Sequence, residues 1–199
     1  MKKLIQVSML LLLSLIGKAQ TDSINVALPI KDNKVFYESI ITTKDSVKKG
    51  KIYLATKEWV SKAFKNSKSV IDFEDKEEGK IVCKFFSKGE KDGTDELEIS
   101  CTMDFTIKDN KYRIQLYNFD VRNNHYGIWD RTKLNPMMPY TKIDIEGMNT
   151  QYITNGKKPW RKKYMIDILK KTDNEVKFII NSAKQSIESA TKQQANKDF

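Results

Sequence analysis

The most regular pattern of apolar and polar positions in this chain lies between residues 96 and 107. Every odd-numbered residue from Leu97 to Ile107 is apolar, and every even-numbered residue from Glu96 to Thr106 is polar or charged. Successive side chains of a strand point to opposite faces of its sheet, so this alternation has the period of a strand. The pattern therefore predicts an antiparallel strand with one buried and one solvated face.

Four further strands are predicted around it, at residues 35–43, 69–74, 80–87 and 111–122. Each is rich in β-branched and aromatic residues and is bounded by turn residues. The turns at residues 76–79, 89–93 and 109–110 are short. The four strands from residue 69 to residue 122 are therefore expected to form a meander.

Two amphipathic helices are predicted from apolar residues that recur at intervals of three and four. The first covers residues 51–66 and includes Trp59 and Phe64. The second begins at Pro159, a residue favoured in the first turn, and keeps this spacing to Ala190. A single helix of that length would be about 50 Å long. Because residues 172–175 have the capping-box pattern, we expect a break or kink near Thr172.

The predicted order is thus strand, helix, four strands, helix. An antiparallel meander with one apolar face and helices packed on that face is a two-layer α+β sandwich of β-α-β4-α order. We expect this single domain to span residues 35–195, after a loose lead-in at residues 20–34. Residues 123–158 form a long irregular insertion in which only residues 142–145 look strand-like; an insertion of this length is either functional or carries structure of its own.

The beginning of the chain has the pattern of a secretory signal peptide. A basic start is followed by an apolar run over residues 4–16 and by the small residues Gly17 and Ala19, which predicts cleavage before Gln20. The apolar run is too short for a stable membrane span. Since no cysteine stands at position 20, a lipid anchor is not expected. The product is predicted to be exported, periplasmic or extracellular, with no transmembrane segment in the mature chain.

The chain is basic, with 36 Lys and Arg against 26 Asp and Glu, a net charge of +10. Loss of residues 1–19 removes three lysines and leaves +7. Such a charge can favour acidic surfaces, lipid head groups, anionic glycans or nucleic acid. The basic residues are spread along the chain, however, which favours a solvated surface of mixed charge.

The two cysteines, Cys83 and Cys101, lie in predicted neighbouring strands. A register centred near residue 92 would place them side by side on one face of the sheet. Two alternatives stay open: a disulfide, as exported proteins often form, or two small apolar core residues. A catalytic role is not expected, because no partner base accompanies them.

The pattern resembles a family of exported Gram-negative bacterial domains of unknown function with a TATA-binding-protein-like fold. The resemblance rests on the first strand, the polar start of the first helix, Trp59 followed by Phe64, and the strand entries Val70-Ile71-Asp72 and Gly79-Lys80-Ile81. It covers about residues 35–122 and the closing helix. The family implies the fold but supplies no activity or site residues.

The sequence contains few residues that could serve catalysis or metal binding. His125 is the only histidine, and no short-spaced ligand cluster or phosphate-binding glycine loop is present, so neither a metal nor a cofactor is expected. Glu96, Glu98 and Asp104 share the outward face of one predicted strand, and Asp72 and Glu74 lie on another. Paired carboxylates can catalyse hydrolysis, but here they are interpreted as a solvated face paired with Arg113 and Lys84.

The candidate ligand-binding residues fall in two places. Aromatic rings beside basic side chains can stack on sugars or bases, and such a cluster stands at the start of the insertion. Trp160 and the basic residues 161–163 lie beyond it. Alternatively, these aromatic side chains pack against the domain and hold the insertion in place. The aromatic and basic cluster comprises His125, Tyr126, Trp129, Asp130, Arg131 and Tyr140.

The second candidate place lies in the last strand of the meander. Tyr117 and Phe119, with Val121, alternate opposite to Ile114 and Leu116 and predict an apolar patch on the second face of the sheet.

These observations favour a non-enzymatic, exported binding domain whose partner is an unknown envelope protein, a glycan or a small molecule. One alternative is an envelope hydrolase that uses His125 or an acidic pair. A second is nucleic-acid binding by analogy of fold, against which export argues.

Overall fold

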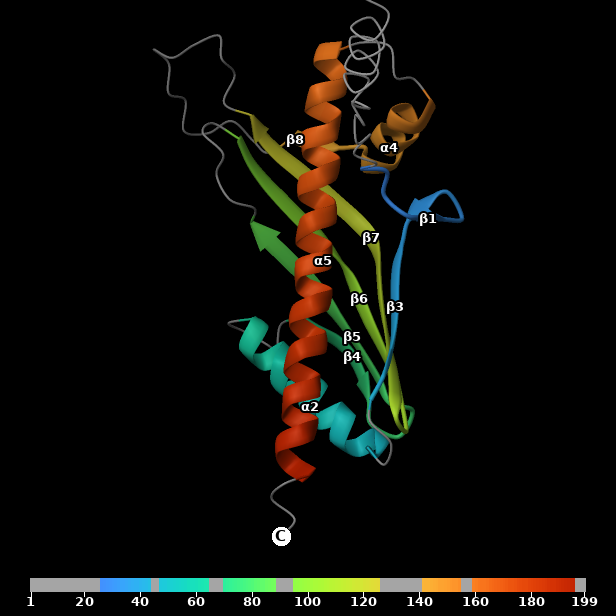
Figure 1. Ribbon diagram of the computed structural model, residues 1–199. Helices are drawn as coiled ribbons and strands as arrows, with labels where there is room; N and C mark the ends of the chain where they lie inside the picture. Colours follow the sequence, from blue (N-terminus) through green and yellow to red (C-terminus); the bar gives the residue numbers. More distant parts are fainter. Residues whose placement is uncertain are drawn as a thin grey trace, which may run out of the picture.

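The computed structural model describes residues 26–43, 47–64, 70–88, 95–125, 141–154 and 159–195. They form two layers, a six-stranded antiparallel sheet and a layer of helices that crosses one of its faces (Figure 1). The predicted α+β sandwich is therefore confirmed. The longest helix runs along the whole length of the sheet.

Four consecutive strands form the predicted meander. The order of strands across the sheet is β3-β7-β6-β5-β4, and β8 pairs with β7 beyond the end of β3. The strands are β3 (Tyr37–Thr42), β4 (Ile71–Asp75), β5 (Lys80–Lys88), β6 (Asp95–Lys108), β7 (Lys111–His125) and β8 (Thr141–Ile143).

Two helices cover the sheet and form the core with it. They are α2 (Lys49–Ala63) and α5 (Pro159–Ala195). The odd-numbered residues of β6 that the alternation assigned to the core are all buried, from Leu97 at 4% exposure to Ile107 at 0%. Val176 and Ala183 of α5 are likewise fully buried. Trp59 of α2 lies against Phe105 of β6, with ring centroids 5.8 Å apart.

The predicted break near Thr172 is wrong, because α5 is one continuous helix. The Thr172 hydroxyl donates to the Ile168 carbonyl one turn earlier, at 2.8 Å, and the side chain is fully buried. Glu175, the other residue of the capping-box pattern, accepts a hydrogen bond from Ser87 of β5. Thr172 thus bonds within the helix and Glu175 bonds to the sheet, so neither side chain caps a helix start and α5 continues unbroken.

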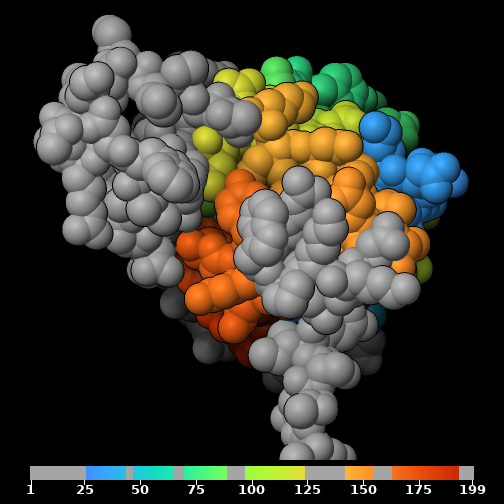
Figure 2. All heavy atoms as spheres, turned by 90° about the horizontal axis from the view of Figure 1, so that it is seen from above, coloured from blue at the N-terminus to red at the C-terminus, as the bar shows by residue number. Residues whose placement is uncertain are grey.

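The insertion contains a helix that the sequence reading did not predict, α4 (Ile145–Thr154). It packs beside α5 and against the N-terminal segment. Figure 2 shows the blue N-terminal residues against the orange residues of α4. The Asn149 amide donates to the Leu28 carbonyl at 3.0 Å and accepts from the Leu28 N–H at 2.8 Å.

The lead-in is more ordered than expected over its described part. Val26 and Leu28 are core residues, with 5% and 3% exposure. They precede a hairpin of β1 (Ile30–Lys31) and β2 (Lys34–Val35). Asp32 and Asn33 connect its strands with φ of 51° and 59°, the left-handed conformation that a tight hairpin turn requires. For residues 26–34 the prediction of a loose segment is wrong, because Val26 and Leu28 anchor this stretch in the core.

The two cysteines are buried free thiols, so the second of the two alternatives holds. Both lie on the core face, as expected, but Cys83 pairs with Met103 and Cys101 with Phe85, which makes them diagonal neighbours. Burial, together with the nearby charges of Asp72 and Asp104, raises the pKa of the Cys83 thiol to about 12. Burial also raises the pKa of Cys101. Neither thiol is ionised at neutral pH, which argues against a nucleophilic role.

Candidate functional site

The second face of the sheet, turned away from α2 and α5, is the largest functional candidate, and we call it the open face. Within the described ranges, no helix packs on it (Figure 1). Its side chains are mostly half-buried or exposed, in contrast to those of the core face. Its central residues are the even-numbered positions of β5 and β6, from Lys80 to Lys88 and from Glu98 to Lys108.

Ion pairs cover the middle of the open face. Among the open-face side chains that the structure describes, the carboxylates of Glu38, Asp72, Glu98, Asp104 and Asp120 each have a basic partner. The N–O distances are 2.7 Å for Lys80–Asp104, 2.8 Å for Arg122–Asp120, 3.0 Å for Lys88–Glu98, 3.4 Å for Lys84–Asp72 and 3.8 Å for Arg113–Glu38. Four of these pairs join neighbouring strands, whereas Arg122–Asp120 lies within β7; together they make a solvated face of paired charges.

The predicted partners are partly correct. Lys84 pairs with Asp72 as expected, whereas Arg113 pairs with Glu38 of β3. Glu74 lies on the helix side instead, where it binds Lys57 at 2.7 Å and accepts from the Tyr53 hydroxyl at 3.2 Å. The Lys57 ammonium is the main reason that the pKa of Glu74 is lowered.

The centre of the open face is the least solvated part. Asp104 is only 6% exposed, and its Oδ1 receives no hydrogen bond. Tyr117 of β7 is close enough for burial and the Asp104 carboxylate to raise its pKa. The Tyr117 ring stacks on Phe36, with centroids 6.4 Å apart. Tyr117 is therefore a neutral hydrogen-bond donor beside a carboxylate acceptor.

Large apolar side chains stand at both edges of the open face. Phe73 of β4 is 54% exposed and pairs with Val82, and Phe86 of β5 is 51% exposed. Ile40 of β3, at the other edge, is 66% exposed. Phe86 also lies beyond the end of β4, which pairs only with residues 80–83 of β5. The open face thus combines paired charges in the middle with apolar side chains at its edges.

The predicted apolar patch of the second face is wrong for Phe119 and Val121. A bulge in β7 places two residues, Asn118 and Phe119, opposite the single residue Cys101. Asn118 has φ of 55°, and the extra residue returns Phe119 to the core face, where its ring lies 5.8 Å from that of Tyr37. Tyr117, before the bulge, does lie on the open face. Its ligand-binding role stays a prediction.

The other predicted ligand-binding residues are not brought together in the described part of the chain. His125 ends β7, paired with Asp95, and its side chain lies outside the description. The same holds for the Trp160 side chain at the start of α5. Tyr126, Trp129, Asp130, Arg131 and Tyr140 lie outside the described residues altogether.

The sequence reading missed Phe73 and Phe86. For Phe86 a signal existed, since Phe85 and Phe86 are adjacent in a strand and must point to opposite faces. Phe73 follows a register shift between residues 71 and 73, which the sequence does not reveal.

The described residues show neither a metal site nor a membrane-spanning helix. Among them, no three His, Cys, Asp or Glu side chains are grouped so that they could hold a metal ion. No helix in the described ranges is long and apolar enough to span a bilayer.

This architecture places the protein in the class of α+β domains with a TATA-binding-protein-like fold. It is similar to the crystal structure of a TBP-like protein from Parabacteroides distasonis, at TM-score 0.53 and 19% identity over 80% of this chain and 97% of that one. It is also similar to a DUF4468 family protein from Bacteroides ovatus, at TM-score 0.58 and 18% identity over 81% and 90% of the two chains. No curated protein matches the chain.

The family itself follows from the sequence match. Residues 36–122 match the model of DUF4468, a domain of unknown function with TBP-like fold. These residues are therefore a DUF4468 domain, and the family and the fold that the resemblance implied are confirmed. The matched range runs from β3 through β7, so it contains nearly the whole open face.

Proposed function

We propose that this protein is an exported, non-catalytic binding domain that holds an envelope protein on the open face of its sheet. The observation that carries the proposal is the exposure of Phe73 and Phe86 by more than half on that face. Exposed apolar side chains beside polar ones are typical of protein contact surfaces, where aromatic residues supply most of the binding energy.

The shape and charge of the open face favour a protein over other partners. Small-molecule sites are concave, whereas a sheet face with side chains at both edges suits a broad contact. A nucleic acid would require cations free to bind phosphates, and the cations Lys80, Arg113 and Arg122 each have a carboxylate within 4 Å. Pairs of both signs favour a partner with its own mixed charges.

The non-catalytic part of the proposal is supported by the state of the candidate groups. The open-face acids are engaged by lysine or arginine, and both thiols are buried. A hydrolase built on an acidic pair would need one carboxylate that keeps its proton near neutral pH. Asp120 does not meet this requirement, because the hydrogen bond from Arg122 lowers its pKa and favours the ionised carboxylate.

The export part of the proposal rests on the leader pattern of residues 1–19. When the full chain is expressed in a Gram-negative host, the mature protein is expected to begin at Gln20, as read by intact mass and N-terminal peptides. Replacing Leu12 and Leu13 with arginine should abolish this cleavage, because the apolar run is then interrupted. Recovery of the wild-type protein with Met1 in the cytoplasm would contradict export.

Site-specific photo-crosslinking in the cells that produce the protein tests the binding surface. A photoreactive residue at Phe86 or Thr102 is expected to give one discrete protein adduct. The same residue at Leu54 of α2 or Ile153 of α4, exposed by 54% and 61%, serves as a matched control on other surfaces. Adducts formed only from the control positions would contradict the proposal.

A further inference from the structure

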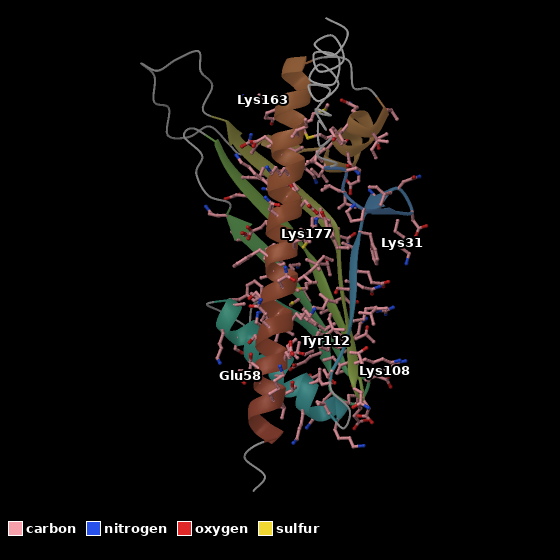
Figure 3. The ribbon with its side chains drawn as sticks, in the orientation of Figure 1. Lys31, Glu58, Lys108, Tyr112, Lys163 and Lys177 are labelled. Carbon is pink, nitrogen blue, oxygen red and sulfur yellow. The ribbon has the colours of Figure 1, made fainter. Side chains whose placement is uncertain are left out.

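A row of lysines runs along the outer side of α5, opposite to its core stripe. Lys163, Lys170, Lys177 and Lys184 recur every seven residues and all four are exposed. At 1.5 Å per residue they stand about 10.5 Å apart and span roughly 31 Å. Figure 3 labels Lys163 near one end of the helix and Lys177 in its middle. We call these four residues the lysine row.

Only one lysine of the row forms an ion pair with another described residue. Lys177 binds Asp173 at 2.7 Å, whereas the neighbouring acids Asp167 and Glu188 bind Lys171 and Lys192, which lie outside the row. The whole helix carries eight basic residues against four acidic ones. In this respect α5 differs from the open face, where the five carboxylates named above each have a basic partner.

The N-terminal end of α5 shows the same excess. Its first turns contain Arg161, Lys162 and Lys163 and no acidic residue in the first turn. A helix N-terminus carries partial positive charge and stabilises acidic side chains, so three basic residues there are unfavourable for the isolated domain. An external surface of negative charge would relieve this repulsion.

The apolar stripe of α5 is not available for insertion into a bilayer. Leu169, Val176 and Ala183 are fully buried in the core. The outer side also carries Phe178, which is 66% exposed beside Lys177. A straight helix on the outside of the molecule, with a row of cations and the exposed ring of Phe178, matches a flat anionic surface.

We propose that the outer side of α5 lies on an anionic phospholipid membrane surface. The lysine row binds lipid phosphates, and Phe178 enters the headgroup region. A flat anionic surface can meet all four lysines at once, because they lie along one straight helix. Because α5 and the open face lie on opposite sides of the sheet, membrane contact leaves the open face free for its partner. The proposal does not depend on the function proposed for that face.

The test is co-sedimentation of the protein with vesicles of phosphatidylcholine, with and without phosphatidylglycerol. Binding is expected only with the anionic lipid and is expected to fall steeply as salt is added. The triple variant K163Q/K170Q/K184Q should bind about a hundredfold more weakly, since each lysine near such a surface contributes about fivefold. F178S should bind the anionic vesicles several-fold more weakly, and the salt dependence of its binding should be that of the wild type.

The matched control is K34Q/K76Q/K108Q, which removes the same charge from exposed lysines outside α5. It should retain binding to within a few-fold, and thermal unfolding should show all variants folded. Equal losses in both triple variants would overturn the proposal, since net charge alone would then explain binding. Absence of binding to the anionic vesicles at low salt, or binding to duplex DNA without binding to vesicles, would overturn it as well.

Discussion

Replacing Trp59 with alanine is expected to lower the free energy of unfolding by about 3–5 kcal/mol, the largest effect of any single change proposed for this protein. Trp59 is 3% exposed and joins both layers of the fold. Its ring lies edge-on to Phe105 of β6 and to Phe64, with centroids 5.8 Å and 6.0 Å apart, and its Nε1 donates to the Ser182 hydroxyl of α5 at 3.2 Å.

The Trp59 variant removes ring packing and leaves a cavity where α2, α5 and the sheet meet. Since domains are stable by only about 5–15 kcal/mol, the variant should be marginally folded. Urea unfolding followed by circular dichroism measures the change. Leu54→Ala on the same helix, at a side chain 54% exposed, should stay within about 0.5 kcal/mol. If both variants lose equally little, Trp59 does not hold the layers together.

The second large effect is expected at Asn149, whose replacement by alanine should cost about 2–4 kcal/mol. The Asn149 side chain is fully buried and satisfies both backbone groups of Leu28. Alanine leaves the N–H and the C=O of Leu28 buried without these partners. Because Leu28 lies in the N-terminal segment, the loss should appear there first.

Limited proteolysis measured beside urea unfolding separates the local from the global effect of Asn149→Ala. Cleavage within residues 26–35 should become faster before the rest of the domain opens. Thr150→Ala, next to it on α4, removes only a hydroxyl that bonds to Glu146 within the helix, and it should change little. Unchanged protease resistance in the Asn149 variant would show that the N-terminal segment is held by other contacts.

The elements with long, clean periodicity were predictable from the sequence. The alternation in β6 and the three-and-four spacing in α5 each give one strong pattern over many residues, and tertiary packing only reinforces them. α4 has the same signal in weaker form, with Ile145, Met148 and Tyr152 on one side. The sequence did not predict α4 because the helix is short and contains Gly147, which makes its helix propensity weak. Its formation therefore depends on packing against α5 and the N-terminal segment.

The composition of the open face was harder to predict, because it depends on bulges. Apolar residues in β7 shift from even positions, such as Leu116, to odd ones, such as Phe119. Such a shift is compatible with a second apolar face or with one inserted residue. The left-handed conformation of Asn118 shows that the second explanation, an inserted residue at a bulge, is correct. Asparagine is among the residues that tolerate this conformation. A single backbone angle thus moves Phe119 from a predicted ligand site into the core.

The central claim is that the open face binds an envelope protein, and one comparison of variants tests it most directly. The experiment compares three purified proteins: the wild type, F73S/F86S and the control L54S/I153S. Each is immobilised and exposed to an envelope extract of the producing bacterium. The quantity measured is the amount retained of the partner protein that photo-crosslinking from the open face has identified. The four positions are similarly exposed, between 51% and 61%, so the two variants remove comparable apolar surface. The account predicts that the control retains the partner as the wild type does and that F73S/F86S loses it. Full retention by F73S/F86S would contradict the account.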